Sequence, residues 1–452
     1  MAKEETKPQH VVYGSAGMAA SGLMPGAKKK GKTAEKAEAK EVLPEASAGE
    51  APSPSLTQPS NLEAPPETSS VTPETPETPE TPDPFEGENT LGAAILLETS
   101  SGASTNSIEM LFQQLDGVRL IAVSEEAESA HEDVSMRFGV EQAFPNHRLM
   151  LEEINPAIVA IPSLSSGRHH ELATLALESG AHVLLESPVT QTLKEADELL
   201  SLASAQERSV AVFLRQRHEP AIQQFHRERE TLIGDLLEIQ IFGESHEIAG
   251  GEDLLRNGLP LLDLALWFAG PPSYCTADIT TSGIPAIDED AHESKEGDFG
   301  PLLGDEISAE FTMESGIRVR FLSNRAHRSV VGPAGMLFVG SKGSMRLFAG
   351  PPCHLSLGIA EDPSAADRTV QWNQWPSPEA TGYVPQDEAT VQNRAVVEDW
   401  LSTIRGETDG VSTLEAASSA LEMVHGIWQA GVTKKRAYFP LANRLHPLAE
   451  PS

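Results

Sequence analysis

Residues 157–188 read AIVAIPSLSSGRHHELATLALESGAHVLLESP, and this stretch decides the fold. Its apolar runs Ala157–Ile161 and His182–Leu185 have the length and composition of buried strands of a parallel sheet. Between these runs, residues 167–179 carry apolar side chains at helical spacing. A strand, a helix and a second strand in this order predict a βαβ unit.

The same alternation continues on both sides of this unit. Further strands are expected at Ala93–Leu97, Val118–Val123 and Val210–Leu214, and further helices at residues 104–116, 127–137 and 192–205. Strands with intervening helices over roughly 120 residues match the size of one nucleotide-binding domain. We therefore predict an α/β Rossmann domain, a doubly wound parallel sheet, over residues 91–215.

From residue 216 to residue 442 the pattern changes to strands joined by tight turns. Strands are expected at Leu236–Phe242, Ile307–Met313 and Ile317–Leu322 and in a hairpin over Met336–Phe348, and helices at about 220–230, 260–268, 389–405 and 413–431. Antiparallel strands with segregated helices predict an α+β domain with a largely antiparallel sheet. We assign this domain to substrate binding and oligomerisation.

The two ends of the chain differ in composition from these domains. Residues 1–90 are rich in Ala, Pro, Glu, Ser, Thr and Lys, and they include the repeat Thr72-Pro73-Glu74. Such a composition buries too little apolar surface to offset the entropy lost on ordering, so we predict disorder there. Residues 443–452 are expected to form a tail.

The charge and the cysteines exclude several classes of protein. A net charge of -34 argues against binding to nucleic acid or to an anionic membrane, both of which attract basic surfaces. Cys275 and Cys353 are the two cysteines, too few for a disulfide framework. No apolar run reaches the ~20 residues of a membrane span. A cytoplasmic location is the expectation.

Residues 283–304 form an acidic insert that contains Asp288, Glu289, Asp290, His292 and Glu293. These side chains are possible metal ligands, but nothing in the sequence fixes their geometry. We interpret the insert as an exposed, mobile loop and expect no metal site.

The turn after the first strand is where a dinucleotide-binding sheet needs glycines, so that backbone amides approach the pyrophosphate. Here the turn reads Glu98-Thr99-Ser100-Ser101-Gly102-Ala103. Glu98 and Ser100 replace the two leading glycines, and Glu98 would direct negative charge at a pyrophosphate. Glu125, at the end of the second strand, is either a ribose-binding acid or an exposed loop residue.

Several motifs of the chain resemble the Gfo/Idh/MocA family of NAD(P)-dependent sugar and polyol dehydrogenases. The resemblance lies in Ile161-Pro162, His169, the run Gly180 to Pro188, Arg217, and Gly258 through Asp263 to Trp267. It continues at Gly340-Ser341-Lys342-Gly343-Ser344 and covers about 350 residues in order. It implies a cofactor site that includes Ser100, Glu125, Pro162, His169, Glu186, Ser187 and Arg217, and a cis Ser187–Pro188 bond.

The family's acid/base residues are largely replaced in this chain. The resemblance places Ser187 at the lysine position of the family's EKP motif, Pro260 at its histidine position and Arg256 at an aspartate position. Asp263 matches a family aspartate, and it is either catalytic or a buried structural residue. Proline cannot titrate, and an unassisted serine is a poor base at neutral pH. Pro260 does suit the first turn of a helix.

Two hypotheses follow from these observations. In the first, the chain is a catalytically silent or impaired relative that binds a sugar-like ligand or a partner protein. In the second, it is an active NAD(P)-dependent oxidoreductase of a sugar or polyol with a rearranged site. The cofactor is NAD or NADP, or none in the silent case. A homo-oligomer formed through the sheet of the second domain is expected.

Overall fold

A computed structural model describes most of the chain after residue 89. The described ranges are 90–98, 111–112, 115–126, 131–163, 165–243, 248–294, 298–324, 334–349, 353–360, 370–376 and 388–449. They lie within one compact unit, Thr78–Ser452. Residues 1–89 of the predicted disordered region, residues 99–103 of the turn after the first strand and residues 104–110 of a predicted helix lie outside the described residues.

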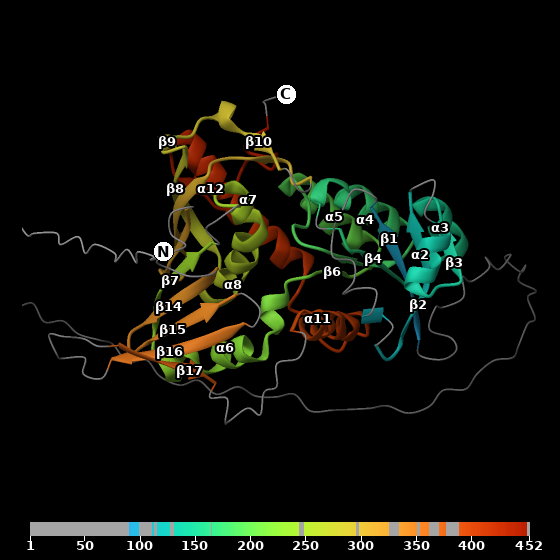
Figure 1. Cartoon of the computed structure of the whole chain (residues 1–452), viewed down its shortest axis with the longest axis horizontal. Helices are drawn as coiled ribbons and strands as arrows, with labels where there is room; N and C mark the ends of the chain where they lie inside the picture. The colour runs from blue at the N-terminus through green and yellow to red at the C-terminus, as the bar shows by residue number, and fades with distance from the viewer. Residues whose placement is uncertain are drawn as a thin grey trace, which may run out of the picture. The chain divides into compact units, whose positions relative to one another are not determined.

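The first domain is built on a six-stranded sheet of order β3-β2-β1-β4-β5-β6, in which every pair is parallel (Figure 1). Its strands are β1 (Leu91–Leu97), β2 (Val118–Glu125), β3 (Gln142–Phe144), β4 (Ile158–Ile161), β5 (His182–Leu185) and β6 (Val210–Val212). Its helices are α2 (His131–Phe138), α3 (His147–Ile154), η1 (Ser166–Arg168), α4 (His169–Glu178) and α5 (Leu193–Ala205). This strand order is that of a Rossmann fold, as predicted.

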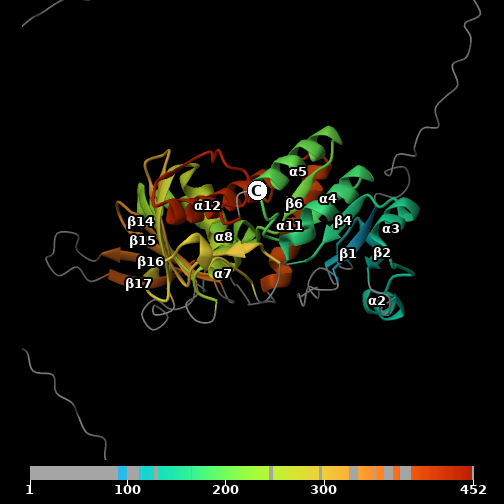
Figure 2. The same cartoon turned by 90° about the horizontal axis from the view of Figure 1, so that it is seen from above.

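Helices cover both faces of the parallel sheet (Figure 2). One face packs on α3, α4 and α5, through buried side chains such as Leu172 and Leu199. The other packs on α2 and on α11 (Glu388–Ile404), which contributes Val396 and Trp400. The Trp400 indole also donates a hydrogen bond to Ser209 Oγ at 3.0 Å. Thus α11, assigned from sequence to the second domain, covers the Rossmann sheet.

The second domain holds a ten-stranded sheet of order β17-β16-β15-β14-β7-β13-β12-β8-β18, with β9 paired to β8. The β7–β13 pair is parallel and the others are antiparallel. Its strands are β7 (Leu236–Phe242), β8 (Pro272–Thr281), β9 (Ile284–Pro285), β12 (Glu306–Met313), β13 (Arg318–Asn324), β14 (Gly335–Gly340), β15 (Ser344–Phe348), β16 (His354–Ala360), β17 (Val370–Trp375) and β18 (Ala437–Tyr438). This is the expected α+β domain.

Helices and short elements complete the second domain. They are η2 (Arg215–His218), α6 (Pro220–Ile233), α7 (Gly251–Asp253), η3 (Leu254–Gly258), α8 (Leu259–Ala269), η4 (Asp288–Asp290), the pair β10 (His292–Glu293) and β11 (Pro301–Leu302), and α12 (Leu414–Thr433). Among the described residues, no helix is long and apolar enough to cross a membrane. Within the same residues, no group of three or more His, Cys, Asp or Glu is placed to hold a metal.

The acidic insert differs from the predicted mobile loop. Its first part, including Asp288 and Glu289, is exposed, but Phe299, Leu302 and Leu303 are buried. The short pair β10–β11 orders its middle. The tail also differs from expectation, because Arg444 forms ion pairs with Asp197 of α5 at 2.6 Å and with Glu422 of α12 at 2.5 Å.

Several histidines are buried or half-buried in the fold. In β5, Nδ1 of His182 accepts a hydrogen bond from the backbone N–H of Ser209 at 2.9 Å, which requires an unprotonated nitrogen. Burial, and secondarily the charge of Arg208, lower the pKa of His182 from 6.5 to about 4. Burial also lowers the pKa of His147, His169, His218, His425 and His446.

We predict that replacing His182 by Asn makes stability less dependent on pH. A histidine with a lowered folded pKa stabilises the fold fully above the unfolded value of 6.5, and this contribution is lost as the pH falls toward 4. The Asn side chain keeps an acceptor for Ser209 but cannot titrate in this range. Melting temperatures between pH 7 and pH 4.5 should therefore fall less steeply in His182→Asn than in the wild type.

The control for this prediction is His292→Asn, at an exposed position in β10. This variant should reproduce the wild-type dependence of melting temperature on pH. Equal slopes for His182→Asn and the wild type would contradict the role given to His182.

Candidate functional site

The carboxyl ends of β1, β2, β4 and β5 form the edge of the parallel sheet where Rossmann domains bind ligands. The first turn, with the predicted cofactor residue Ser100, lies outside the described residues. Glu98, at its start, is described and buried. Its Oε1 lies 4.0 Å from Nε of Arg168, so this carboxylate faces a guanidinium.

Arg168 gathers three carboxylates at this edge. Its Nη1 donates to Glu126 at 3.0 Å, and its Nε and Nη2 donate to Glu171 at 3.0 and 2.9 Å. These hydrogen bonds, chiefly those to Glu171, raise the pKa of Arg168, while the guanidinium lowers the pKa of Glu171. The negative charge of Glu98 is therefore partly offset where a pyrophosphate would approach. Sequence reasoning did not identify Arg168 or Glu126, which carry no motif.

Glu125, the predicted ribose-binding residue, is half-buried at the end of β2, opposite Leu97 of β1 in the sheet register. The neighbouring Glu126 accepts the hydrogen bond from Nη1 of Arg168. On the same strand, Ser124 Oγ lies 2.7 Å from Nδ1 of the buried His147. Two adjacent acids, Glu125 and Glu126, thus lie at the carboxyl end of β2. The ribose-binding role of Glu125 remains a prediction.

His169 connects the loops that follow β4 and β5. Its Nε2 lies 2.9 Å from the carbonyl oxygen of Ser163, and its Nδ1 lies 2.9 Å from that of Pro188. The ring is fully buried, and burial lowers its pKa although Glu98 and the carbonyls act in the opposite direction. Pro162 is buried at the end of β4 beside Ser163. These two predicted cofactor residues are therefore both buried near the carboxyl end of β4.

Glu186 forms a buried ion pair at the end of β5. Both of its carboxylate oxygens accept hydrogen bonds from Arg215, one from Nη1 at 3.2 Å. Arg215 also donates to the buried Asn393 of α11 and stacks over the Phe213 ring, 4.7 Å from its centroid. The following Ser187 is half-buried, and the Ser187–Pro188 bond is cis, as expected.

Asp263 and Arg217 form a second buried pair. The Arg217 guanidinium donates to Oδ2 and Oδ1 of Asp263 at 2.7 and 2.5 Å, and its Nη1 donates to the carbonyl of Val411 at 3.3 Å. Burial raises the pKa of Asp263 to about 6, against the opposite effect of Arg217. Both carboxylate oxygens of the predicted catalytic residue are thus engaged by one arginine.

The other predicted acid/base positions hold no titratable base. Pro260 lies in the first turn of α8, as predicted. Arg256 contacts Glu252 at 2.9 Å and lies over the Phe299 ring, 5.3 Å from its centroid. His218 follows Arg217 in η2 and is buried, with Nε2 2.8 Å from Ser412 Oγ.

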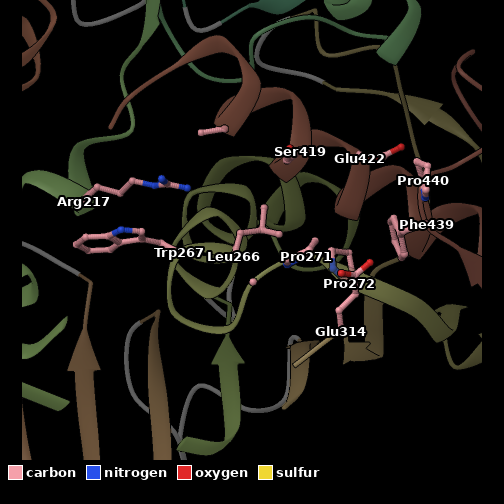
Figure 3. Close-up of a pocket in the computed structure, with 12 residues that line it drawn as sticks. Arg217, Leu266, Trp267, Pro271, Pro272, Glu314, Ser419, Glu422, Phe439 and Pro440 are labelled. Carbon is pink, nitrogen blue, oxygen red and sulfur yellow. The ribbon is translucent and has the colours of Figure 1, made fainter. Parts of the chain in front are cut away.

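A pocket of about 440 Å³ lies at the far end of α8 from Pro260. Figure 3 shows Arg217 and Trp267 at one end and Phe439 and Pro440 at the other. Arg217 is the one predicted site residue in its lining. No residue from the carboxyl ends of β1, β2, β4 and β5 lines this pocket. We therefore do not assign the alcohol oxidation of the resembled family to the pocket.

Residues 100–214 match the model of an oxidoreductase family with an NAD-binding Rossmann fold, Gfo/Idh/MocA. The matched segment covers most of the Rossmann domain. The match ends within the first domain, in the loop that precedes Arg215 and Arg217. It includes Pro162, His169, Glu186 and Ser187, whereas Asp263 and Pro260 lie beyond it.

Curated relatives agree with this assignment over part of their length. A protein named as an oxidoreductase, YceM of Salmonella typhimurium, is 27% identical over 110 residues, which is 24% of this chain and 34% of the relative. The D-glucoside 3-dehydrogenase of Escherichia coli is 26% identical over 171 residues, 34% of this chain and 48% of the relative. The chain thus matches between about a third and a half of these proteins.

Solved structures share the fold over both domains. An NAD-binding oxidoreductase of Klebsiella pneumoniae has a TM-score of 0.61 at 16% identity, covering 77% of this chain and 99% of the other. A levoglucosan dehydrogenase in complex with NADH and levoglucosan has a TM-score of 0.61 at 16% identity, covering 78% and 100%. The two-domain fold is therefore shared with these solved structures.

We predict that Arg217 and Asp263 stabilise the fold as a pair, so that the effects of their substitutions on the free energy of unfolding are not additive. Removing one partner leaves an uncompensated buried charge, so Arg217→Met and Asp263→Leu should each cost about 3–5 kcal/mol of unfolding free energy. The double variant removes both charges and should be destabilised by much less than the sum of the two. Urea unfolding followed by circular dichroism measures all three.

An exposed ion pair provides the control. Arg394 lies 2.7 Å from Glu398 on the surface of α11, and Arg394→Met should leave the urea midpoint essentially unchanged. Additive losses in the double variant, or wild-type stability in both single variants, would contradict a structural pair.

Proposed function

We propose that this protein is a catalytically silent or impaired Gfo/Idh/MocA relative that binds a sugar-like ligand or a partner. The engagement of Asp263 by Arg217 carries the proposal. Alcohol oxidation with hydride transfer needs a base that accepts the hydroxyl proton. Neither Ser187 nor Pro260 supplies one at the positions given by the family resemblance.

The carboxylates of the ligand-binding edge support the same proposal. Glu98, Glu186 and Asp263 face Arg168, Arg215 and Arg217, respectively. An acid that is buried against a guanidinium contributes to the scaffold, and moving Asp263 to reach a substrate would leave the buried Arg217 without its carboxylate partner. This pairing favours a cleft that binds over one that transfers protons.

An active NAD(P)-dependent oxidoreductase of a sugar or polyol is the second candidate. Two observations favour it. Arg168 offsets the charge of Glu98, which weakens the electrostatic objection to a bound pyrophosphate. The pKa of Asp263, about 6, lies near the range in which a general base works at neutral pH. In this case Glu125 would bind the ribose and His169, Glu186 and Ser187 would line the nicotinamide side.

The outer face of the ten-stranded sheet is our proposed surface for a homo-oligomer. Its charged side chains are the exposed Arg318 and the partly exposed Glu238, Glu310 and Arg320, in which Arg320 lies 3.0 Å from Glu238 and 2.9 Å from Glu310. Alternating charges on one face can pair across a two-fold axis, which makes this surface self-complementary.

We predict that the wild-type protein does not bind NADH or NADPH with micromolar affinity and does not reduce NAD or NADP in the presence of sugars or polyols. The first turn lacks the glycines that let backbone amides reach a pyrophosphate. Titration followed by nicotinamide fluorescence measures binding, and absorbance at the nicotinamide band measures turnover.

The variant Glu98→Gly/Ser100→Gly restores the two leading glycines and serves as the matched comparison. It should bind NADH more tightly than the wild type, because both the negative charge and the side chains leave the turn. A micromolar dissociation constant for either cofactor in the wild type would overturn the silent-relative proposal in favour of the oxidoreductase.

A further inference from the structure

Three consecutive basic residues follow the C-terminus of α12. Lys434, Lys435 and Arg436 are all exposed, and none of them forms an ion pair with another described residue. The chain has 33 basic and 67 acidic residues, so its cations have many possible acidic partners. In the same sheet, for example, Arg320 pairs with Glu310. Three adjacent cations without an acidic partner therefore stand out in this chain.

These cations line a pocket of about 420 Å³ at the edge of the ten-stranded sheet. The rest of its wall comes from β8, β12 and β13 and from Ala430 of α12. Arg320 and Glu310 also line the pocket, but they hold each other at 2.9 Å. Asp278 is the remaining acid in the lining. Positive charge therefore predominates among the unpaired side chains of the pocket at neutral pH.

Stacking on a tyrosine holds Arg436 in place. Its guanidinium lies over the Tyr274 ring, 4.5 Å from the centroid. The centroid of the Tyr274 ring in turn lies 5.9 Å from that of the Tyr438 ring. A guanidinium that stacks on a ring keeps its in-plane N–H donors available to a ligand. Arg436 can thus bind an anion without first leaving a carboxylate.

The sheet edge beside the cations has an open backbone position. In β8, the carbonyl of Ile279 accepts a hydrogen bond from the backbone N–H of Ala286 at this edge. Peptide groups alternate in direction along a strand, so the N–H and the carbonyl of Ala277 point to the same edge. Neither group is bonded to a described residue, because the pairing of β18 with β8 stops at Cys275. Ala277 lines the pocket, and its N–H is a further donor there.

We propose that this pocket, formed by Lys434, Lys435, Arg436 and the edge of β8 at Ala277, binds the phosphoryl group of a small molecule. A phosphoryl group has three acceptor oxygens and a charge of about -1.5 to -2 near neutral pH, which matches one guanidinium and two ammonium groups. The pocket has the size of a small-molecule site. A long polyanion fits less well, because a chain of net charge -34 would repel it beyond the pocket.

Phosphoryl binding at this pocket does not depend on the proposed function. Helix α12 has 20 residues, which makes it about 30 Å long. It begins shortly after Val411, which Arg217 contacts, and it ends at Lys434. The pocket therefore lies at the opposite end of α12 from the Arg217–Asp263 pair. Phosphate binding and cofactor binding can be measured separately on the same protein.

Titration of the full chain with inorganic phosphate at constant ionic strength, followed by phosphorus NMR line broadening, tests the proposal. Arg436→Gln should weaken binding by about tenfold, because a hydrogen bond between charged groups is lost. Asp278→Asn should strengthen binding, because it removes a negative charge from the lining. The control, Lys342→Gln, changes the net charge as Arg436→Gln does, at an exposed position between β14 and β15, and should bind phosphate as the wild type does.

Two results of this titration would overturn the proposal. The first is an absence of phosphate binding to the wild type, and the second is equal affinity in Arg436→Gln and Lys342→Gln. The lysines could instead serve only to offset the dipole at the C-terminus of α12. In that case Lys435→Gln would lower the melting temperature and leave the phosphate affinity unchanged, which would also overturn the proposal.

Chemical modification of arginines tests where the phosphate binds. Phenylglyoxal reacts with accessible guanidinium groups, and mass spectrometry of the peptides gives the rate for each arginine. Inorganic phosphate should slow the modification of Arg436 severalfold. It should not change the rate at Arg119, which is exposed in β2 of the Rossmann domain. Equal protection of both arginines, or of neither, would overturn the site while leaving the proposed function untouched.

Discussion

The buried ion pair between Arg217 and Asp263 ties together the parts of the second half of the chain. Arg217 lies in η2, directly after the last Rossmann strand, and Asp263 lies in the middle of α8. The same guanidinium donates to the carbonyl of Val411, next to the segment that pairs with β6. A charge buried at this depth needs its partner. The pair therefore holds α8, η2 and the segment at Val411 in one arrangement.

This pair belongs to a wider pattern of charge pairing at the ligand-binding edge. Glu98 faces Arg168, and Glu186 is held by Arg215, which also donates to Asn393 of α11. Residue types that the family uses in its site are thus part of pairs that join strand ends to helices. A carboxylate held in this way stabilises the fold, because moving it would separate a buried charge from its partner.

The sequence predicted the fold well where local signals are strong. The β4–α4–β5 unit, β7 and α12 lie within a few residues of their predicted ranges, because buried apolar runs and helical spacing are properties of adjacent residues. β3 and α3 were missed, as Gln142–Phe144 is a short strand of mixed polarity. β8, β16, β17 and β18 were also missed. β17, with the sequence VQWNQW, is held by pairing to β16 and has little apolar alternation of its own.

The sequence by itself determined the two-domain architecture and the loss of particular side chains. Pro260 cannot titrate and Ser187 is not a lysine, whatever surrounds them. Only the tertiary structure decided what the remaining residues do. Asp298 and Gly167 are 131 positions apart in the sequence, and Arg217 and Asp263 are 46 positions apart. No local sequence pattern therefore predicts that either pair is in contact. Partner choice between distant charges depends on how the chain packs, and only that packing placed Asp263 against Arg217 as one half of an ion pair.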